Sequence, residues 1–134
     1  MEKGLKFYDI SSFFHFDERG WRINPYADNY FNISQKGSFH IVSILPNAVR
    51  GNHIHLTTDE WIAFWGGKCE FFWEERGELK RKLFEKDKAY LVFIPEGIAH
   101  ACKNVGDNES FLFSYYVKRV SDYEKETVRK VLIS

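Results

Sequence analysis

The chain has 134 residues, of which 44% are hydrophobic and 28% charged, so it is long enough for one domain and too short for an additional cofactor-binding domain. Nineteen basic and nineteen acidic residues give a formal net charge of zero, which argues against a nucleic-acid-binding or anionic-membrane-binding surface. Met1 to Lys6 lack the apolar stretch of a signal peptide, and no apolar run reaches the length of a membrane span. We therefore expect a soluble, cytoplasmic protein with one domain over residues 1–134, and neither nucleic acid nor membrane as a partner.

Short runs of β-forming residues, separated by turn signals, follow one another along the chain. We expect strands at residues 39–45, 60–65, 69–73, 90–94 and 111–117, with turns at Gly66-Gly67, Arg76-Gly77 and Gly106-Asp107-Asn108. This spacing predicts an all-β barrel or sandwich. Near the end of the chain, Ser121-x-x-Glu124 fits a helix capping box ahead of Val128, Val131 and Leu132, so a short C-terminal helix is also expected.

Two cysteines, Cys69 and Cys102, lie in apolar strand-like runs and form no disulfide framework, which agrees with a reducing cytoplasm. The strand alternation that includes His100 also includes Cys102, and such a thiol is usually a small apolar filler. His15 and His40 belong to no motif, so we interpret both as structural or surface residues.

Three other histidines and one carboxylate form a candidate metal site. His53 and His55 lie on the same face of a strand, because successive side chains of a strand point to opposite sides. Glu60 follows after a plausible turn, and His100 lies forty residues further on. Three nitrogen donors and one oxygen donor suit a divalent first-row metal such as Zn, Ni, Mn or Fe better than calcium or magnesium.

The same residues carry a resemblance to the cupin superfamily. His53-x-His55, Glu60 and Gly67, followed by Pro95-x-Gly97-x-x-His100-x-x-x-Asn104, resemble the paired motifs of that superfamily. The resemblance implies an all-β, cupin-type antiparallel β-barrel, a double-stranded β-helix or jelly roll. The glycine that usually opens each motif is replaced by Asn47 and Ala89, and neither of these is a ligand position.

Further segments resemble the RmlC-like cupins, and the likeness covers roughly residues 13 to 126. Asp17-Glu18-Arg19-Gly20-Trp21, Arg50-Gly51-x-His53, Pro95-x-Gly97-x-Ala99-His100 and Tyr123-x-x-Glu126 resemble segments of the nucleotide-linked 4-keto-6-deoxyhexose 3,5-epimerases. His55 gives Arg-Gly-x-His-x-His, which resembles the sugar-nucleotide 3,4-ketoisomerases. Arg50 to His55 with Glu60, and Asn104 to Glu109 after His100, resemble the metal-binding cupin domain of some capsular-polysaccharide reductases.

This resemblance implies an epimerase or isomerase that acts next to the ketone of a nucleotide-linked 4-keto-6-deoxyhexose in surface polysaccharide biosynthesis. His53 or His55 would serve as the base and Tyr123 as the acid on the opposite face of the sugar. Arg19 and Arg50 would hold the diphosphate, and Trp21 and Tyr26 would stack on the nucleotide base. No organic cofactor is implied.

Two questions stay open in the sequence. If His53 and His55 bind a metal, neither is available as the base, and the complete set with Glu60 and His100 favours the metal. Two alternative functions remain. The first is a metal-dependent oxygenase, and the second is a non-catalytic module that binds a sugar or a metal. Aromatic residues make up 18% of the chain, and this surplus favours a homodimer that pairs through the N-terminal strands.

Overall fold

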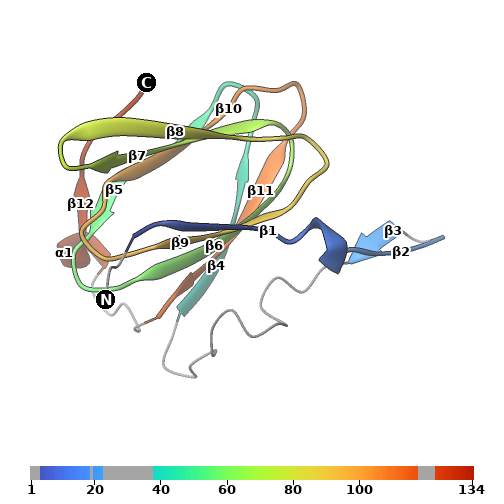
Figure 1. The fold of residues 1–134 in the computed structure, drawn as a ribbon, viewed down its shortest axis with the longest axis horizontal. Coiled ribbons are helices and arrows are strands. Elements are labelled where there is room, and N and C mark those ends of the chain that lie inside the picture. Colours follow the sequence, from blue (N-terminus) through green and yellow to red (C-terminus); the bar gives the residue numbers. More distant parts are fainter. Residues whose placement is uncertain (1–3, 19, 23–37, 118–122) are drawn as a thin grey trace.

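The computed structural model describes residues 4–18, 20–22, 38–117 and 123–134, and it consists of two facing antiparallel β-sheets (Figure 1). The first sheet has the order β1 (Lys6–Asp9), β9 (Tyr90–Ile94), β6 (Glu60–Gly66), β11 (Ser110–Tyr116), β4 (Ser38–Ile44). The second has the order β12 (Thr127–Arg129), β5 (Val49–His55), β10 (His100–Asn104), β7 (Cys69–Glu75), β8 (Glu78–Phe84). The predicted all-β, cupin-type architecture is confirmed, and each predicted run contains a strand.

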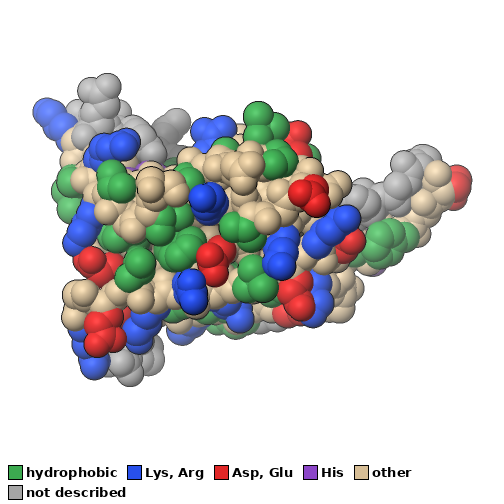
Figure 2. All heavy atoms as spheres, turned by 90° about the horizontal axis from the view of Figure 1, so that it is seen from above, with side chains coloured by type: hydrophobic (Ala, Val, Ile, Leu, Met, Phe, Trp, Pro, Cys, Tyr) green, Lys and Arg blue, Asp and Glu red, His purple; other side chains and the backbone are tan. Residues whose placement is uncertain are grey.

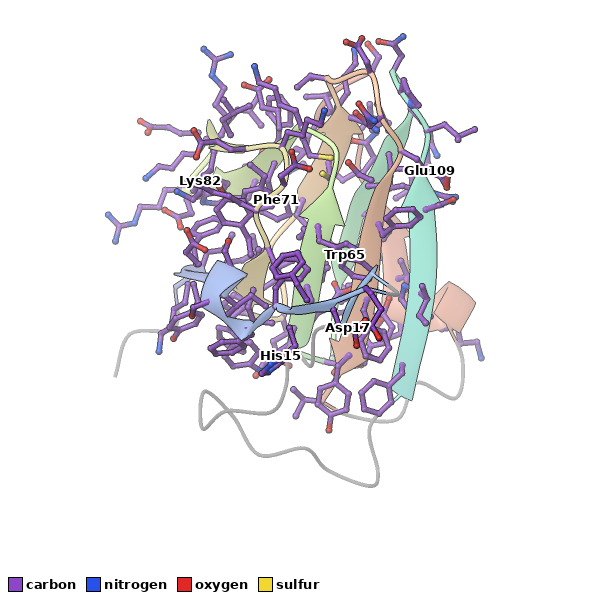
Figure 3. All side chains as sticks on the ribbon, turned by 90° about the vertical axis from the view of Figure 1, so that its right-hand side faces the viewer. His15, Asp17, Trp65, Phe71, Lys82 and Glu109 are labelled. Carbon is purple, nitrogen blue, oxygen red and sulfur yellow. The ribbon has the colours of Figure 1, made fainter. Side chains whose placement is uncertain are left out.

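A small hairpin lies beside the two sheets. A 3-10 helix, η1 (Ser11–Phe13), follows β1 and leads to β2 (His15–Asp17), which pairs with β3 (Gly20–Arg22). The hairpin extends away from the sheets (Figure 1), and His15 lies on it (Figure 3).

Side-chain alternation along the strands of the first sheet produces two apolar layers. On β6, Ile62 and Phe64 belong to a cluster between the sheets, whereas Trp61 and Ala63 belong to a cluster on the outer face. Phe71 of β7 points into the space between the sheets (Figure 3). The inner cluster comprises Ile44, Ile62, Phe64, Cys69, Phe71, Phe84, Tyr90, Val92, Ile94, Cys102 and Leu112. Because Glu60 shares the alternation of Ile62 and Phe64, its carboxylate is directed to the inside as well.

The predicted C-terminal helix is a single turn, α1 (Tyr123–Glu126), and Val128 lies in strand β12 instead. Thr127, Val128 and Arg129 pair with His55, Ile54 and His53 of β5. As an edge strand, β12 forms backbone hydrogen bonds with β5, and a longer helix could not form them. This pairing therefore outweighs the local helix signal. Ser121, the first residue of the predicted capping box, lies outside the described residues.

Among the described residues, no helix has the length and apolarity needed to cross a membrane. On the face shown in Figure 2, basic and acidic side chains are interspersed among apolar ones.

Candidate metal centre

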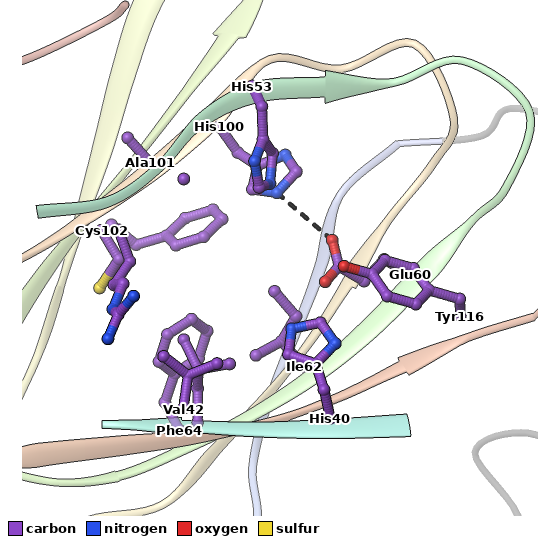
Figure 4. Close-up of a pocket in the computed structure, with 14 residues that line it drawn as sticks. His40, Val42, His53, Glu60, Ile62, Phe64, His100, Ala101, Cys102 and Tyr116 are labelled. Atoms are coloured by element: carbon purple, nitrogen blue, oxygen red, sulfur yellow. Dashed lines mark ion pairs between the residues drawn. The ribbon is translucent and has the colours of Figure 1, made fainter. Parts of the chain in front are cut away.

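A cavity of about 230 Å³ lies between the two sheets (Figure 4). One wall carries polar residues from β5 and β10, and the opposite wall is formed by β4, β6 and β11. The cavity is lined by His40, Val42, Arg50, Gly51, His53, Glu60, Ile62, Phe64, Phe71, His100, Ala101, Cys102, Leu112 and Tyr116.

Three of the four residues that the spacing singles out line this cavity, and the fourth, His55, lies beside them. His53 and His55 come from β5, Glu60 begins β6, and His100 begins β10, where it pairs directly with His53. One donor atom from each residue lies within 4.8 Å of those of the other three. Three strands, β5, β6 and β10, therefore bring three imidazoles and one carboxylate to a single point, and this group could hold a metal ion.

Hydrogen bonds on the outer side of the group fix which atoms face its centre. Nδ1 of His100 lies 3.0 Å from the Ile98 carbonyl oxygen, which can only accept, so this nitrogen carries the proton and Nε2 faces inward. Nδ1 of His55 donates to Oε1 of Glu126 at 2.7 Å. The Ser114 hydroxyl donates to Oε2 of Glu60, which leaves Oε1 for the centre.

The inward atoms have the spacing of metal ligands. Nε2 of His55 and Nε2 of His100 each lie 3.3 Å from Oε1 of Glu60, and Figure 4 marks one of these pairs. Bonds of about 2.0–2.1 Å to a tetrahedral ion would place two ligand atoms roughly 3.3 Å apart. Oε1 of Glu60 and Nε2 of His100 are buried and have no hydrogen-bond partner among the described residues. Burial of such atoms is costly unless a partner is supplied, so the residues fit a divalent ion.

Electrostatics favour the ligating forms of two of these residues. Burial raises the pKa of Glu60, but the adjacent imidazoles of His100 and His55 outweigh it and hold the pKa well below its usual range. Burial and the neighbouring His100 and His55 lower the pKa of His53 to about 4, so its imidazole is neutral at pH 7. Burial also lowers the pKa of His55, but Glu60 and Glu126 outweigh this and raise it. An ion would therefore compete with a proton at His55.

Gly51 allows β5 to approach the strand that begins with His100. Its φ angle is +92°, and an added Cβ atom would lie 2.9 Å from the His100 carbonyl oxygen and 3.0 Å from Cα of Ala101. The pairing of β5 and β10 shifts register between His100 and Ala101. Only glycine combines this backbone conformation with this close approach.

Comparisons with known proteins agree on the architecture. Solved structures that resemble the chain include the capsular polysaccharide assembling protein CapF from Staphylococcus aureus, with a TM-score of 0.66 and 21% identity over 89% of this chain and 34% of that chain. A dTDP sugar isomerase from Desulfovibrio desulfuricans has a TM-score of 0.74 and 16% identity, and the match covers 96% of this chain and 85% of that chain. QdtA, a sugar 3,4-ketoisomerase from Thermoanaerobacterium thermosaccharolyticum in complex with TDP, has a TM-score of 0.66 and 14% identity, and the match covers 97% of this chain and 90% of that chain. The fold is that of the RmlC-like cupins. At these identities the likeness concerns the fold alone.

No protein-family model matches this chain. An oxalate decarboxylase from Arthroderma benhamiae is 30% identical over 94 residues, which are 69% of this chain and 22% of the relative. The chain thus spans about a fifth of the length of the curated relative it matches.

The structure places only some of the residues that were predicted to bind substrate. Arg50 is exposed, lines the cavity and donates from Nε to the Ser43 carbonyl oxygen at 3.1 Å. Arg19 and Tyr26 lie outside the described residues. Trp21 lies in β3 and Tyr123 in α1, but their side chains are outside the described part of the chain. Their predicted roles stay predictions.

His40, which the sequence alone indicates to be a structural or surface residue, lies at the cavity. His40 lines the cavity, and its ring centroid lies 5.2 Å from that of Tyr116, whose own centroid lies 4.9 Å from that of His55. Burial lowers the pKa of His40, Glu60 raises it and His55 lowers it, and the net direction is downward. The alternation His40, Val42, Ile44 would have placed His40 on the inner face. His15, by contrast, is exposed.

Proposed function

We propose that this cupin is a metal-binding isomerase or epimerase that acts on a nucleotide-linked 4-keto-6-deoxyhexose in surface polysaccharide biosynthesis. The observation that carries the proposal is the cavity itself, in which His53 and His100 of the ligand set face Glu60 and the neutral imidazole of His40 on the opposite wall (Figure 4). Arg50, with its exposed guanidinium, contributes to the same cavity. The TDP-bound ketoisomerase and the dTDP sugar isomerase of the same fold support this class of substrate.

The size of the cavity supports a division of the substrate into two parts. Pockets that enclose a whole drug-sized ligand have volumes of about 300–1,000 Å³. At about 230 Å³ the cavity suits the sugar ring, and the nucleotide would lie outside it. Arg50 would then bind the diphosphate, for which its planar, bidentate guanidinium is suited. Arg19, Trp21 and Tyr26 stay further candidates for this outer part.

In this proposal His53, His55, Glu60 and His100 hold the ion, which when bound would act as a Lewis acid on the ketone oxygen. The low pKa of His53 favours this role over that of a base, because a group with a pKa of about 4 holds a proton poorly at pH 7. His40 and Tyr116 then line the cavity as groups that can accept or donate a proton beside the ketone. Tyr123 is retained as the candidate acid on the opposite face of the sugar. Without an ion, His55 is the better base, because Glu60 and Glu126 raise its pKa.

The test is proton exchange at the carbon next to the ketone. We expect deuterium from solvent to enter this position of thymidine- or uridine-linked 4-keto-6-deoxyhexoses when metal-loaded protein is present, as followed by NMR. His53→Ala should abolish the exchange, because it removes a ligand of the ion that would polarise the ketone, whereas Arg50→Ala should mainly weaken binding. His15→Ala, on the exposed hairpin, is the matched control. The absence of both exchange and binding with all of these substrates would overturn the proposal.

A second candidate function is metal-dependent decarboxylation of a small carboxylic acid. The partial match to an oxalate decarboxylase favours it, and so does the cavity volume, which would enclose a small dicarboxylate completely. Release of carbon dioxide from oxalate by metal-loaded protein, with no exchange on keto sugars, would favour this candidate over the first.

A further inference from the structure

The carboxylate of Glu126 lies directly behind one member of the ligand set. Oε1 accepts a hydrogen bond from Nδ1 of His55 at 2.7 Å and another from the Thr127 hydroxyl at 3.0 Å, while Oε2 accepts one from the Thr57 backbone N–H at 3.2 Å. The residue is 7% exposed. Nδ1 of His100 donates to a neutral backbone carbonyl, whereas Nδ1 of His55 donates to a carboxylate.

Glu126 belongs to a segment, residues 125–134, that is attached to the strand carrying two of the ligands. Its backbone oxygen accepts a hydrogen bond from the Leu56 N–H at 3.0 Å, and β12 pairs along His53 to His55. Further on, Lys130 N–H donates to the Asn52 backbone oxygen at 2.8 Å. The Asn52 side chain accepts from Leu132 N–H at 2.9 Å and donates to the Ile133 oxygen at 2.9 Å. The segment thus contacts β5 on both sides of His53.

We infer that Glu126 is a positioning residue that couples ion binding at the quartet to docking of residues 125–134. The bond to Glu126 holds the His55 ring with Nε2 toward Glu60, and its negative charge stabilises the positive charge that an ion would bring. Both effects exist only while the segment is docked on β5. Coupling of this kind is reciprocal, so a bound ion should hold the segment in place by the same factor. The inference rests on the proposed metal site.

Glu74 offers a matched control. It forms an ion pair with Lys130 of the same segment, at the surface and away from His55. Glu74→Gln therefore removes the same charge and a contact of the same segment without changing the hydrogen bond to His55. Exposed ion pairs are worth little, so this variant should bind an ion about as well as the wild type.

The experiment measures Zn²⁺ affinity by competition with a chelator for wild type, Glu126→Ala, Glu126→Gln and Glu74→Gln. We expect Glu126→Ala to lose about 10- to 100-fold in affinity. Glu126→Gln should lose less, because an amide oxygen can still accept from Nδ1. The Co²⁺-loaded Glu126→Gln protein should also show a shifted visible absorption band, which a purely structural role would not produce.

Hydrogen exchange tests the reciprocal half. In the wild type, Zn²⁺ should slow exchange of the Leu56, Thr57, Lys130 and Leu132 amides, and Glu126→Ala should lose this protection. If Glu126→Ala does not fold, the inference is tested by the Zn²⁺ affinity of Glu126→Gln and by the protection of these amides by Zn²⁺ in the wild type. Wild-type affinity in both Glu126 variants, or no protection of these amides by Zn²⁺, would overturn the inference alone. No Zn²⁺ binding by the wild type would overturn the proposed metal site and the inference with it.

Discussion

The imidazole of His53 lies next to those of His55 and His100, at ring-centroid distances of 4.6 and 4.8 Å, and burial with these neighbours lowers its pKa to about 4. In the unfolded chain the pKa is near its ordinary value of 6.5. The unfolded state therefore binds a proton first as the pH falls, and stability decreases between pH 6.5 and about 4. His53 should lower the free energy of unfolding over this range by on the order of 2 kcal/mol, which is less than its full pKa shift would give, because the side chain is partly exposed to water.

This pH dependence can be measured by urea denaturation of chelator-treated protein at pH 7 and pH 5. We expect His53→Asn to show a smaller loss of unfolding free energy over this range than the wild type does. His15→Asn, at an exposed position, should keep the wild-type loss. An unchanged pH dependence in His53→Asn would contradict the assignment of this effect to His53.

At the scale of single elements, the meeting of β5 and β10 sets the position of His100, and Gly51 makes the meeting possible. Gly51→Ala would place a Cβ atom 2.9 Å from the His100 carbonyl oxygen. Gly77 also has a positive φ angle, +76°, but an added Cβ there would meet no atom within 4 Å. We expect Gly77→Ala to cost about 1 kcal/mol for the backbone conformation alone. Gly51→Ala should cost roughly 1–3 kcal/mol more, because backbone atoms must move.

Thermal unfolding and Zn²⁺ titration of the two glycine variants distinguish backbone strain alone from a displacement of the metal ligand His100. Gly51→Ala should lower both stability and ion affinity, whereas Gly77→Ala should lower stability alone. Equal effects of the two variants on ion affinity would show that the approach of β5 to β10 does not position His100.

The elements that the sequence predicts and those it does not differ in what stabilises them. β6 and β9 are apolar and alternate clearly, so their strands and inner faces follow from pattern. β8 contains Lys80, Arg81 and Lys82 and has no such pattern, because an edge strand needs only its pairing with β7. Parts of the site likewise depend on contacts between residues far apart in the sequence, so local patterns do not predict them. Glu126 lies 71 residues from His55, and no local spacing relates the two.

For the molecule as a whole, the outer face of the first sheet carries a second apolar cluster. Trp61, Ala63, Leu91 and Tyr115 are buried there. Toward β4, the last strand of this sheet, apolar side chains become exposed, with Phe39 at 46% and Ile41 at 72%. Apolar side chains that continue from a buried cluster to an exposed edge are typical of a surface that a second subunit covers. This pattern supports the predicted homodimer, with β4 at its interface.

The dimer prediction can be tested by placing a charge on β4. If Ile41 is covered by a second copy, Ile41→Glu buries an unpaired carboxylate and should raise the dimer dissociation constant by at least about tenfold, roughly 1.4 kcal/mol. Leu79→Glu on β8 is the matched control, because Leu79 is 53% exposed and lies on the other sheet. Light scattering at micromolar concentration should report a dimer for the wild type and Leu79→Glu, and monomer for Ile41→Glu. A wild-type monomer would exclude the dimer, and dissociation by Leu79→Glu alone would move the interface from β4 to β8.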